Sequence, residues 1–105
     1  MARDQWTAWA ESDLEEIVVY ISRERSRDGT AKKIYTDIRQ RCRLYANNPL
    51  LGELYPDLGS DYRGFVHKRW LVIYVPREYG IEVFAVLDSA RDFQAFFRQR
   101  LKTGE

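Results

Sequence analysis

Cysteine and histidine are nearly absent from this chain, which has one of each, Cys42 and His67. A single cysteine excludes a disulfide bond within the chain, and no group of cysteines and histidines has the spacing of a zinc site. We therefore expect no metal site and no bound cofactor. Cys42 lies among apolar residues at helical spacing, which indicates a buried thiol without chemistry of its own.

Long hydrophobic runs and an excess of charge of one sign are also missing. Apolar runs such as Trp70–Val75 are far shorter than the ~18 residues of a membrane-spanning helix. Seventeen Lys and Arg residues against sixteen Asp and Glu give a formal net charge of +1, which excludes a protein that holds nucleic acid by charge alone. The first residues lack the apolar core of a signal peptide, so we expect a cytoplasmic protein without membrane association.

The composition of the chain is typical of a single globular domain. Apolar residues make up 45% of its 105 residues and charged residues 31%, which argues against disorder. A chain of this length buries enough apolar surface for one core but not for two. We therefore expect residues 1–105 to form one domain.

The first half of the chain shows the apolar periodicity of two helices. In Ala8–Arg25 the apolar residues recur at i, i+4, i+7, i+8 and i+11, which places them on one helical face. Thr7 is expected to cap this helix, although Ser12 begins a second stretch that fits a capping box. After a turn at Ser26–Gly29, the same periodicity predicts a helix over Thr30–Ala46. Two helices joined by a short turn form an antiparallel hairpin.

The remaining segments predict strands, because aromatic and β-branched residues dominate them between short breaks. They also predict a last helix, because an apolar stripe recurs at helical spacing and favours core packing over a binding surface; its members are Phe93, Phe96, Phe97 and Leu101. The expected elements are strands at Arg3–Thr7, Tyr62–His67, Trp70–Val75 and Ile81–Leu87, a loop at Leu50–Asp61, a hairpin turn at Pro76–Gly80 and a helix at Asp92–Lys102. The last three strands form an antiparallel meander. The whole order predicts an α+β domain in which helices cover one face of a mainly antiparallel sheet.

Several short motifs, taken in order, resemble those of the RelE/ParE toxin superfamily. They span nearly the whole chain and look most like the ParE branch, the plasmid stabilisation family. The motifs are Ala10–Ile17 with Tyr20 and Ile21, Asn48-Pro49 followed by Gly52, Tyr62–Phe65, Trp70–Tyr74 and Val86–Asp92.

The resemblance implies a toxin of a type II toxin–antitoxin system. ParE-like members inhibit DNA gyrase and are neutralised by a ParD-like antitoxin in a hetero-oligomer, which is the function we expect here. Two alternatives remain open: a RelE-like endonuclease that cuts mRNA on the ribosome, or an inactivated toxin that only binds its antitoxin. The chain has no recognisable helix-turn-helix, so we expect the antitoxin to supply sequence-specific DNA binding.

The chain departs from the resembled pattern at one informative place. ParE-like chains often read Val-Leu-His-Gly-Ala-Arg-Asp near the end of the last strand, whereas this chain has Asp88 and Ser89 in place of the histidine and glycine. The missing histidine weakens any expectation of a general acid or base there. We therefore expect a binding protein with no catalytic residue rather than an enzyme.

His67, Lys68 and Arg69 form a cationic group at the predicted turn between two strands. Such a group can stabilise charge on a phosphate, and a histidine can move a proton near neutral pH. The alternative is a solvated hairpin tip without function. The three residues are candidates for binding the target.

Arg63 and Arg91 are further candidates for target binding, because both lie on or near predicted strands where they could line one face of the sheet. Arginine binds carboxylate and phosphate groups equally well. The alternative is that each arginine pairs with a neighbouring carboxylate, Asp61 for Arg63 and Asp92 for Arg91.

The helical hairpin supplies candidates for antitoxin binding, since the resemblance implies an antitoxin tail that wraps over the hairpin and sheet. In the apolar run that begins at Ile17, Val19 points nearly opposite the core and Tyr20 flanks it. With Tyr35 of the second helix, Ile17, Val19 and Tyr20 are the candidates. Residues 1–31 carry a charge of −3 and residues 32–45 a charge of +4, so the helices either attract one another or present a basic strip to a partner.

Overall fold

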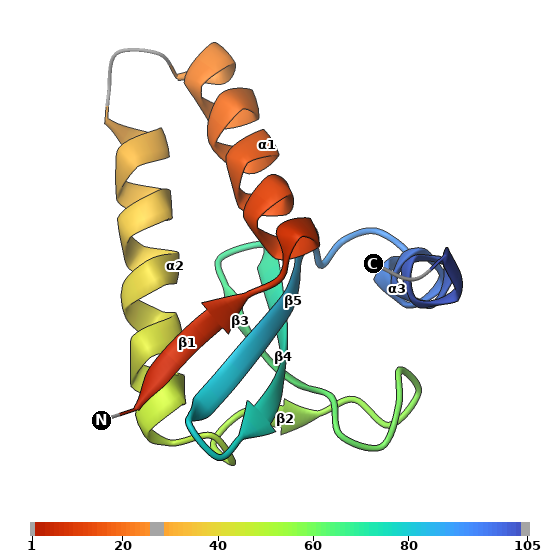
Figure 1. The fold of residues 1–105 in the computed structure, drawn as a ribbon. Coiled ribbons are helices and arrows are strands. Elements are labelled where there is room, and N and C mark those ends of the chain that lie inside the picture. The colour runs from red at the N-terminus through yellow and green to blue at the C-terminus, as the bar shows by residue number, and fades with distance from the viewer. Residues whose placement is uncertain (1, 26–28, 104–105) are drawn as a thin grey trace.

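The computed structural model describes residues 2–25 and 29–103, which fold into a five-stranded sheet with helices packed on it (Figure 1). The helices are α1 (Ala8–Glu24), α2 (Thr30–Asn47) and α3 (Phe93–Thr103), and the strands are β1 (Arg3–Trp6), β2 (Glu53–Leu54), β3 (Arg63–His67), β4 (Trp70–Arg77) and β5 (Gly80–Asp88). The α+β class is confirmed, and each predicted helix and strand is present with small differences at its ends. Only the short strand β2 was not expected.

The strand order is β1-β5-β4-β3-β2. β3, β4 and β5 form the predicted antiparallel meander, and β2 extends it at the outer edge of β3. β1 lies parallel to β5, with Arg3 opposite Gly80 and Trp6 opposite Val83. Gly80 permits this close approach, since a Cβ atom there would lie 2.1 Å from the carbonyl oxygen of Arg3 and its φ is 142°.

Both faces of the sheet are covered, so the expectation that helices lie on one face is wrong for α3. α1 and α2 pack on one face (Figure 1). On the other face, Phe97 of α3 packs with Leu58, Leu71 and Ile73. The reason is visible in Trp70–Val75, whose consecutive residues are all buried. An apolar run without alternation is typical of a strand covered on two faces.

Helix α1 begins at Ala8, directly after its capping residue Thr7. Thr7 is buried and accepts a hydrogen bond from the backbone N–H of Ala10 at 3.1 Å, so the cap predicted at Thr7 is confirmed. The alternative start at Ser12 is wrong. Leu14 and Ile21 are buried against the sheet, whereas Val18 beside them is half-buried.

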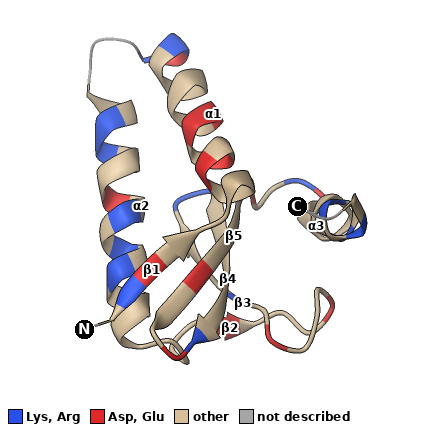
Figure 2. Cartoon of the chain, in the orientation of Figure 1, with Lys and Arg blue, Asp and Glu red and all other residues tan. Residues whose placement is uncertain are grey.

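The hairpin of α1 and α2 places opposite charges side by side (Figure 2). Arg39 of α2 binds Glu11 of α1 at 2.5 Å, and its guanidinium lies 4.1 Å from the ring centroid of Trp6. Arg39 therefore contributes to attraction between the two helices, whereas Lys32 and Arg43 remain exposed on α2. The turn predicted at 26–29 falls outside the described residues except for its last position.

The turn between β4 and β5 is tighter than predicted. Pro76 and Arg77 continue β4, and Gly80 already belongs to β5. Proline cannot donate to a strand ladder and is tolerated at an edge. The pairing of β3 with β4 ends at Tyr74. At Pro76, therefore, β4 is paired only with β5 and its other edge is free of a neighbouring strand.

Tyr74 anchors the loop after α2 from inside the core. Its ring is fully buried, and its hydroxyl accepts a hydrogen bond from the N–H of Gly52 at 2.9 Å and donates one to the carbonyl of Pro49 at 2.7 Å. We expect Tyr74→Phe to lower the free energy of unfolding by about 1–3 kcal/mol, because both backbone groups lose their partner. Urea unfolding measures this change. Tyr20→Phe, at an exposed ring, is the control and should leave stability unchanged; equal losses in both variants would contradict the prediction.

Candidate functional site

The tip between β3 and β4 carries two exposed cations. Lys68 has a positive φ of 57°, which forms the tight turn, and Lys68 and Arg69 are both exposed. Arg69 makes an ion pair with Asp88 at the end of β5, and its guanidinium lies 5.0 Å from the ring centroid of Trp70. The tip is thereby held against the last residue of β5.

Arg91 joins the same carboxylate from the segment before α3. Its Nε atom lies 3.7 Å from Oδ2 of Asp88, while 83% of its side chain is exposed. The hydrogen bond from Arg69 lowers the pKa of Asp88, and the backbone N–H of Ala90 contributes in the same direction. We call Arg69, Asp88 and Arg91 the Asp88 cluster. The expected pairing of Arg91 with Asp92 is wrong, because Asp92 accepts a hydrogen bond from the N–H of Ala95 within the first turn of α3.

His67 does not lie at a solvated tip, so that alternative is wrong for this residue. Its side chain is only 14% exposed and faces α2, where Nε2 lies 3.6 Å from Oδ2 of Asp37. Nε2 has no hydrogen-bond partner among the described residues. Burial lowers the pKa of His67, and the positive charges of Arg41 and Lys68 act in the same direction, while Asp37 opposes them. His67 therefore lies beneath α2, apart from the exposed cations that follow it.

We expect the pKa of His67 to lie below the value of about 6.5 for free histidine. The unfolded chain then binds the proton more tightly than the folded chain. The stability that neutral His67 contributes is thus complete above about pH 6.5 and is lost as the pH falls through the lower folded pKa. Because His67 is the only histidine, NMR of its ring protons against pH measures this directly. Asp37→Asn should lower the pKa further, and a wild-type value at or above that of free histidine would contradict the prediction.

Arg63 lies at the opposite end of β3 from the Asp88 cluster. It donates hydrogen bonds to the carbonyl oxygens of Leu50 at 3.1 Å and Gly52 at 2.8 Å. The expected pairing with Asp61 is therefore wrong, and the guanidinium instead holds the loop after α2. Since a strand rises by about 3.3 Å per residue, Arg63 is roughly 13 Å from His67 along β3. The structure does not bring Arg63 together with the other target-binding candidates.

A groove of about 200 Å³ opens beside the Asp88 cluster, between α1, the ends of β4 and β5, and α3. Two of its walls are aromatic rings that remain half exposed, Tyr20 of α1 at 52% and Phe96 of α3 at 55%. Its lining residues are Asp13, Glu16, Ile17, Tyr20, Trp70, Val86, Leu87, Asp88 and Phe96. The sequence identified Ile17 and Tyr20 but assigned Phe96 to the core, which is wrong.

The other two antitoxin-binding candidates lie outside this groove. Val19 is 44% exposed on the face of α1 opposite the core, as predicted. Tyr35 is 42% exposed on α2 and lies near Arg39, whose guanidinium is 5.1 Å from the centroid of its ring. Because Arg39 also contacts Trp6 of β1, Tyr35 belongs to the β1 side of the hairpin. The three candidates on α1 therefore lie apart from Tyr35 on α2, and the four do not form one patch.

A comparison with known protein families decides to which family the chain belongs. The family model described as "ParE toxin of type II toxin-antitoxin system, parDE" matches residues 5–93. The chain belongs to the ParE toxin family. No curated protein matches it. The resemblance found in the short motifs is confirmed, and membership in this family implies a toxin that is paired with an antitoxin.

Two residues depart from the common motif of ParE-like chains, Asp88 and Ser89, and both bind Arg69 in this structure. Asp88 is the counter-ion of Arg69, as described above. Ser89 binds the carbonyl oxygen of Arg69 through both its backbone N–H and its hydroxyl, each at 2.8 Å. Both residues therefore fasten the β3–β4 tip to the end of β5.

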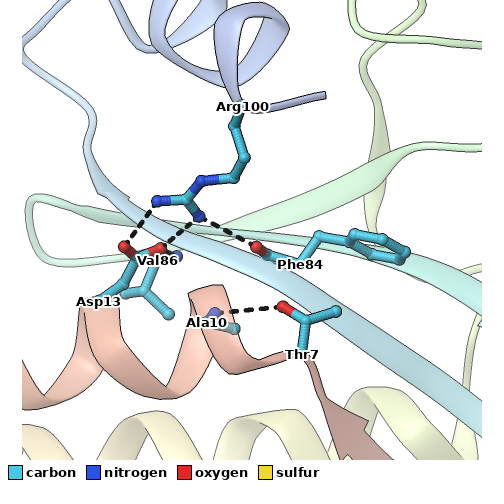
Figure 3. A network of polar contacts seen from close by, with 6 residues as sticks. All are labelled: Thr7, Ala10, Asp13, Phe84, Val86 and Arg100. Carbon is cyan, nitrogen blue, oxygen red and sulfur yellow. Dashed lines mark hydrogen bonds and ion pairs between the residues drawn. The ribbon is translucent and has the colours of Figure 1, made fainter. Parts of the chain in front are cut away.

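The match to the ParE toxin family ends at Phe93, so most of α3 lies beyond it. This helix is fixed by Arg100, which binds both carboxylate oxygens of Asp13 at 2.8 Å and the carbonyl oxygen of Phe84 at 3.1 Å (Figure 3). Asp13 also accepts a hydrogen bond from the N–H of Val86 at 3.0 Å. Sequence reasoning missed this ion pair, because no local pattern links residues so far apart in the chain.

The described residues contain no helix that is long and apolar enough to cross a membrane. They also contain no group of three or more His, Cys, Asp or Glu side chains that could hold a metal ion. Cys42 is fully buried in the core, as predicted, and burial raises the pKa of its thiol. A thiol of this kind is unreactive because the thiolate is the nucleophile.

Proposed function

We propose that this chain inhibits DNA gyrase and is neutralised by a ParD-like antitoxin, acting in the cytoplasm where gyrase works. The observation that carries the proposal is the family match over residues 5–93. The mechanism is one of binding: a toxin that prefers the gyrase state holding cleaved DNA shifts gyrase toward that state. Such a mechanism needs no catalytic residue in the toxin.

The positions of the candidate side chains support binding over catalysis. General acid–base cleavage of RNA needs a base and an acid within hydrogen-bond reach of the reacting groups. His67 faces Asp37 beneath α2, and Arg63 is occupied by two backbone carbonyls. Lys68, Arg69 and Arg91 remain as exposed cations, which we propose contact the target.

Purified chain added to gyrase tests the proposal. We expect loss of supercoiling together with accumulation of cleaved DNA. The double variant Lys68→Glu with Arg91→Glu should require about tenfold more protein for the same inhibition, because like-charge contacts replace favourable ones. Arg98→Glu, a charge reversal at an exposed position on α3, is the control and should inhibit like the wild type.

Two results would overturn the proposal in different ways. Growth arrest with intact gyrase activity and cut transcripts in a translating extract would identify an mRNA endonuclease. Normal growth on expression without an antitoxin, again with intact gyrase activity, would identify a family member that only binds its antitoxin.

A further inference from the structure

We infer that Asp88 is a positioning residue for target binding, because it sets where Arg69 and Arg91 present their guanidinium groups. The inference rests on that part of the proposed function which assigns these two cations to the target. It gives a role to the residue that stands where ParE-like chains often have histidine. Asp88 is itself mostly covered, so it acts through the two arginines.

The carboxylate of Asp88 is held in place by the sheet. Asp88 is the last residue of β5 and lies opposite Trp70 of β4, and its side chain is only 12% exposed. Its Oδ1 atom accepts a hydrogen bond from the N–H of Ala90 at 3.0 Å, which leaves Oδ2 to the arginines. The hydrogen bonds from Arg69 and Ala90 lower the pKa of Asp88, so this fixed group stays negatively charged at neutral pH.

The two arginines come from connecting segments rather than from the sheet itself. Arg69 lies in the turn between β3 and β4, and Arg91 lies between β5 and α3. Both approach Oδ2 of Asp88, which brings the two segments to one point. A free arginine side chain loses conformational entropy when a partner immobilises it, and this loss weakens binding. Because Asp88 already restricts the arginines, part of that entropy is lost on folding rather than on binding.

Pairing with Asp88 leaves both arginines able to bind a further group. Their side chains are 53% and 83% exposed, respectively. A guanidinium has five N–H donors, and the hydrogen bond of Arg69 to Asp88 uses only its Nη2 atom. Since two arginines share one carboxylate, the Asp88 cluster keeps a charge of +1. Asp88 therefore orients the cations without neutralising both of them.

The variant Asp88→Asn tests the inference, because positioning and charge alone predict opposite effects. Removal of the carboxylate raises the charge of the Asp88 cluster from +1 to +2, which by itself would strengthen binding to an acidic target surface. We expect weaker binding instead, so that about fivefold more protein is required for the same loss of gyrase supercoiling. Glu82→Gln is the matched control. Glu82 lies on the same strand and pairs with Arg77, so the same change of net charge should leave inhibition unchanged.

A double-mutant cycle shows whether Asp88 acts through the two arginines. In a chain that carries Arg69→Ala and Arg91→Ala, we expect Asp88→Asn to cause no further loss of inhibition. A further fivefold loss in that chain would identify a purely structural role and overturn the inference.

NMR relaxation of the arginine Nε–Hε groups measures positioning without any target. In the wild type, Arg69 should be more rigid than Arg98, which is exposed on α3. In Asp88→Asn, the two side chains should be equally mobile. Equal mobility already in the wild type would overturn the inference.

The outcomes separate this inference from the proposed function. If the wild type inhibits gyrase and Asp88→Asn inhibits it equally or more strongly, only the inference is overturned. Growth arrest with intact gyrase activity would overturn gyrase as the target. The same variants are then compared by growth arrest, and Asp88→Asn should need higher expression for the same arrest. A chain that neither inhibits gyrase nor arrests growth would overturn both.

Discussion

Replacing Arg100 by methionine is expected to lower the free energy of unfolding by about 3–5 kcal/mol, because Asp13 is left as an unpaired buried charge. The side chains of Arg100 and Asp13 are only 9% and 11% exposed, and two hydrogen bonds of 2.8 Å join them. Methionine keeps most of the apolar stem, so the loss reports the missing charge rather than lost packing. Urea unfolding followed by circular dichroism measures the change.

The control for this prediction lies two residues away on the same helix. Arg98 is exposed, and its contact with the carbonyl oxygen of Asp57 is long, at 3.5 Å. Arg98→Met should therefore change stability by less than about 0.5 kcal/mol. A loss of similar size in both variants, or no loss in Arg100→Met, would show that the ion pair does not hold α3 in place.

The local elements of this fold could be predicted from the sequence because each has its own period. Apolar spacing indicated α1 and α2, and the cap at Thr7 was correctly predicted because its hydroxyl acts within one turn. Helix α3 was predicted as an element but not placed on the second face. That placement depends on Phe97 and Arg100 meeting residues far away in the sequence.

The candidate site could be predicted only where it depends on residues close together in the sequence. Charge and position in a turn identified Lys68 and Arg69 as exposed cations. Charge and predicted position failed for His67, expected at the turn, and for Arg63, expected on a face of the sheet. Their partners are Asp37 on α2 and the carbonyl oxygens of the loop after α2. The groove was not predictable at all, since its walls come from three elements and a periodic pattern cannot distinguish Phe96 from Phe97.

Phe96 and Phe97 give the sharpest test of how α3 is used, because neighbouring phenylalanines on one helix have opposite environments. Phe97 is fully buried against the second face of the sheet, whereas Phe96 is 55% exposed beside the groove. We expect Phe97→Ala to lower the free energy of unfolding by about 3–5 kcal/mol, through lost burial and the cavity it leaves. Phe96→Ala should lower it by less than about 1 kcal/mol, mainly through the lost contact with the guanidinium of Arg100.

Urea unfolding of the two variants, followed by circular dichroism, measures the difference. Phe96→Ala should unfold at nearly the same urea concentration as the wild type, whereas Phe97→Ala should unfold at a much lower one. Equal destabilisation by both substitutions would mean that α3 is packed through both rings. Phe96 would then belong to the contact between α3 and the sheet, despite its exposure.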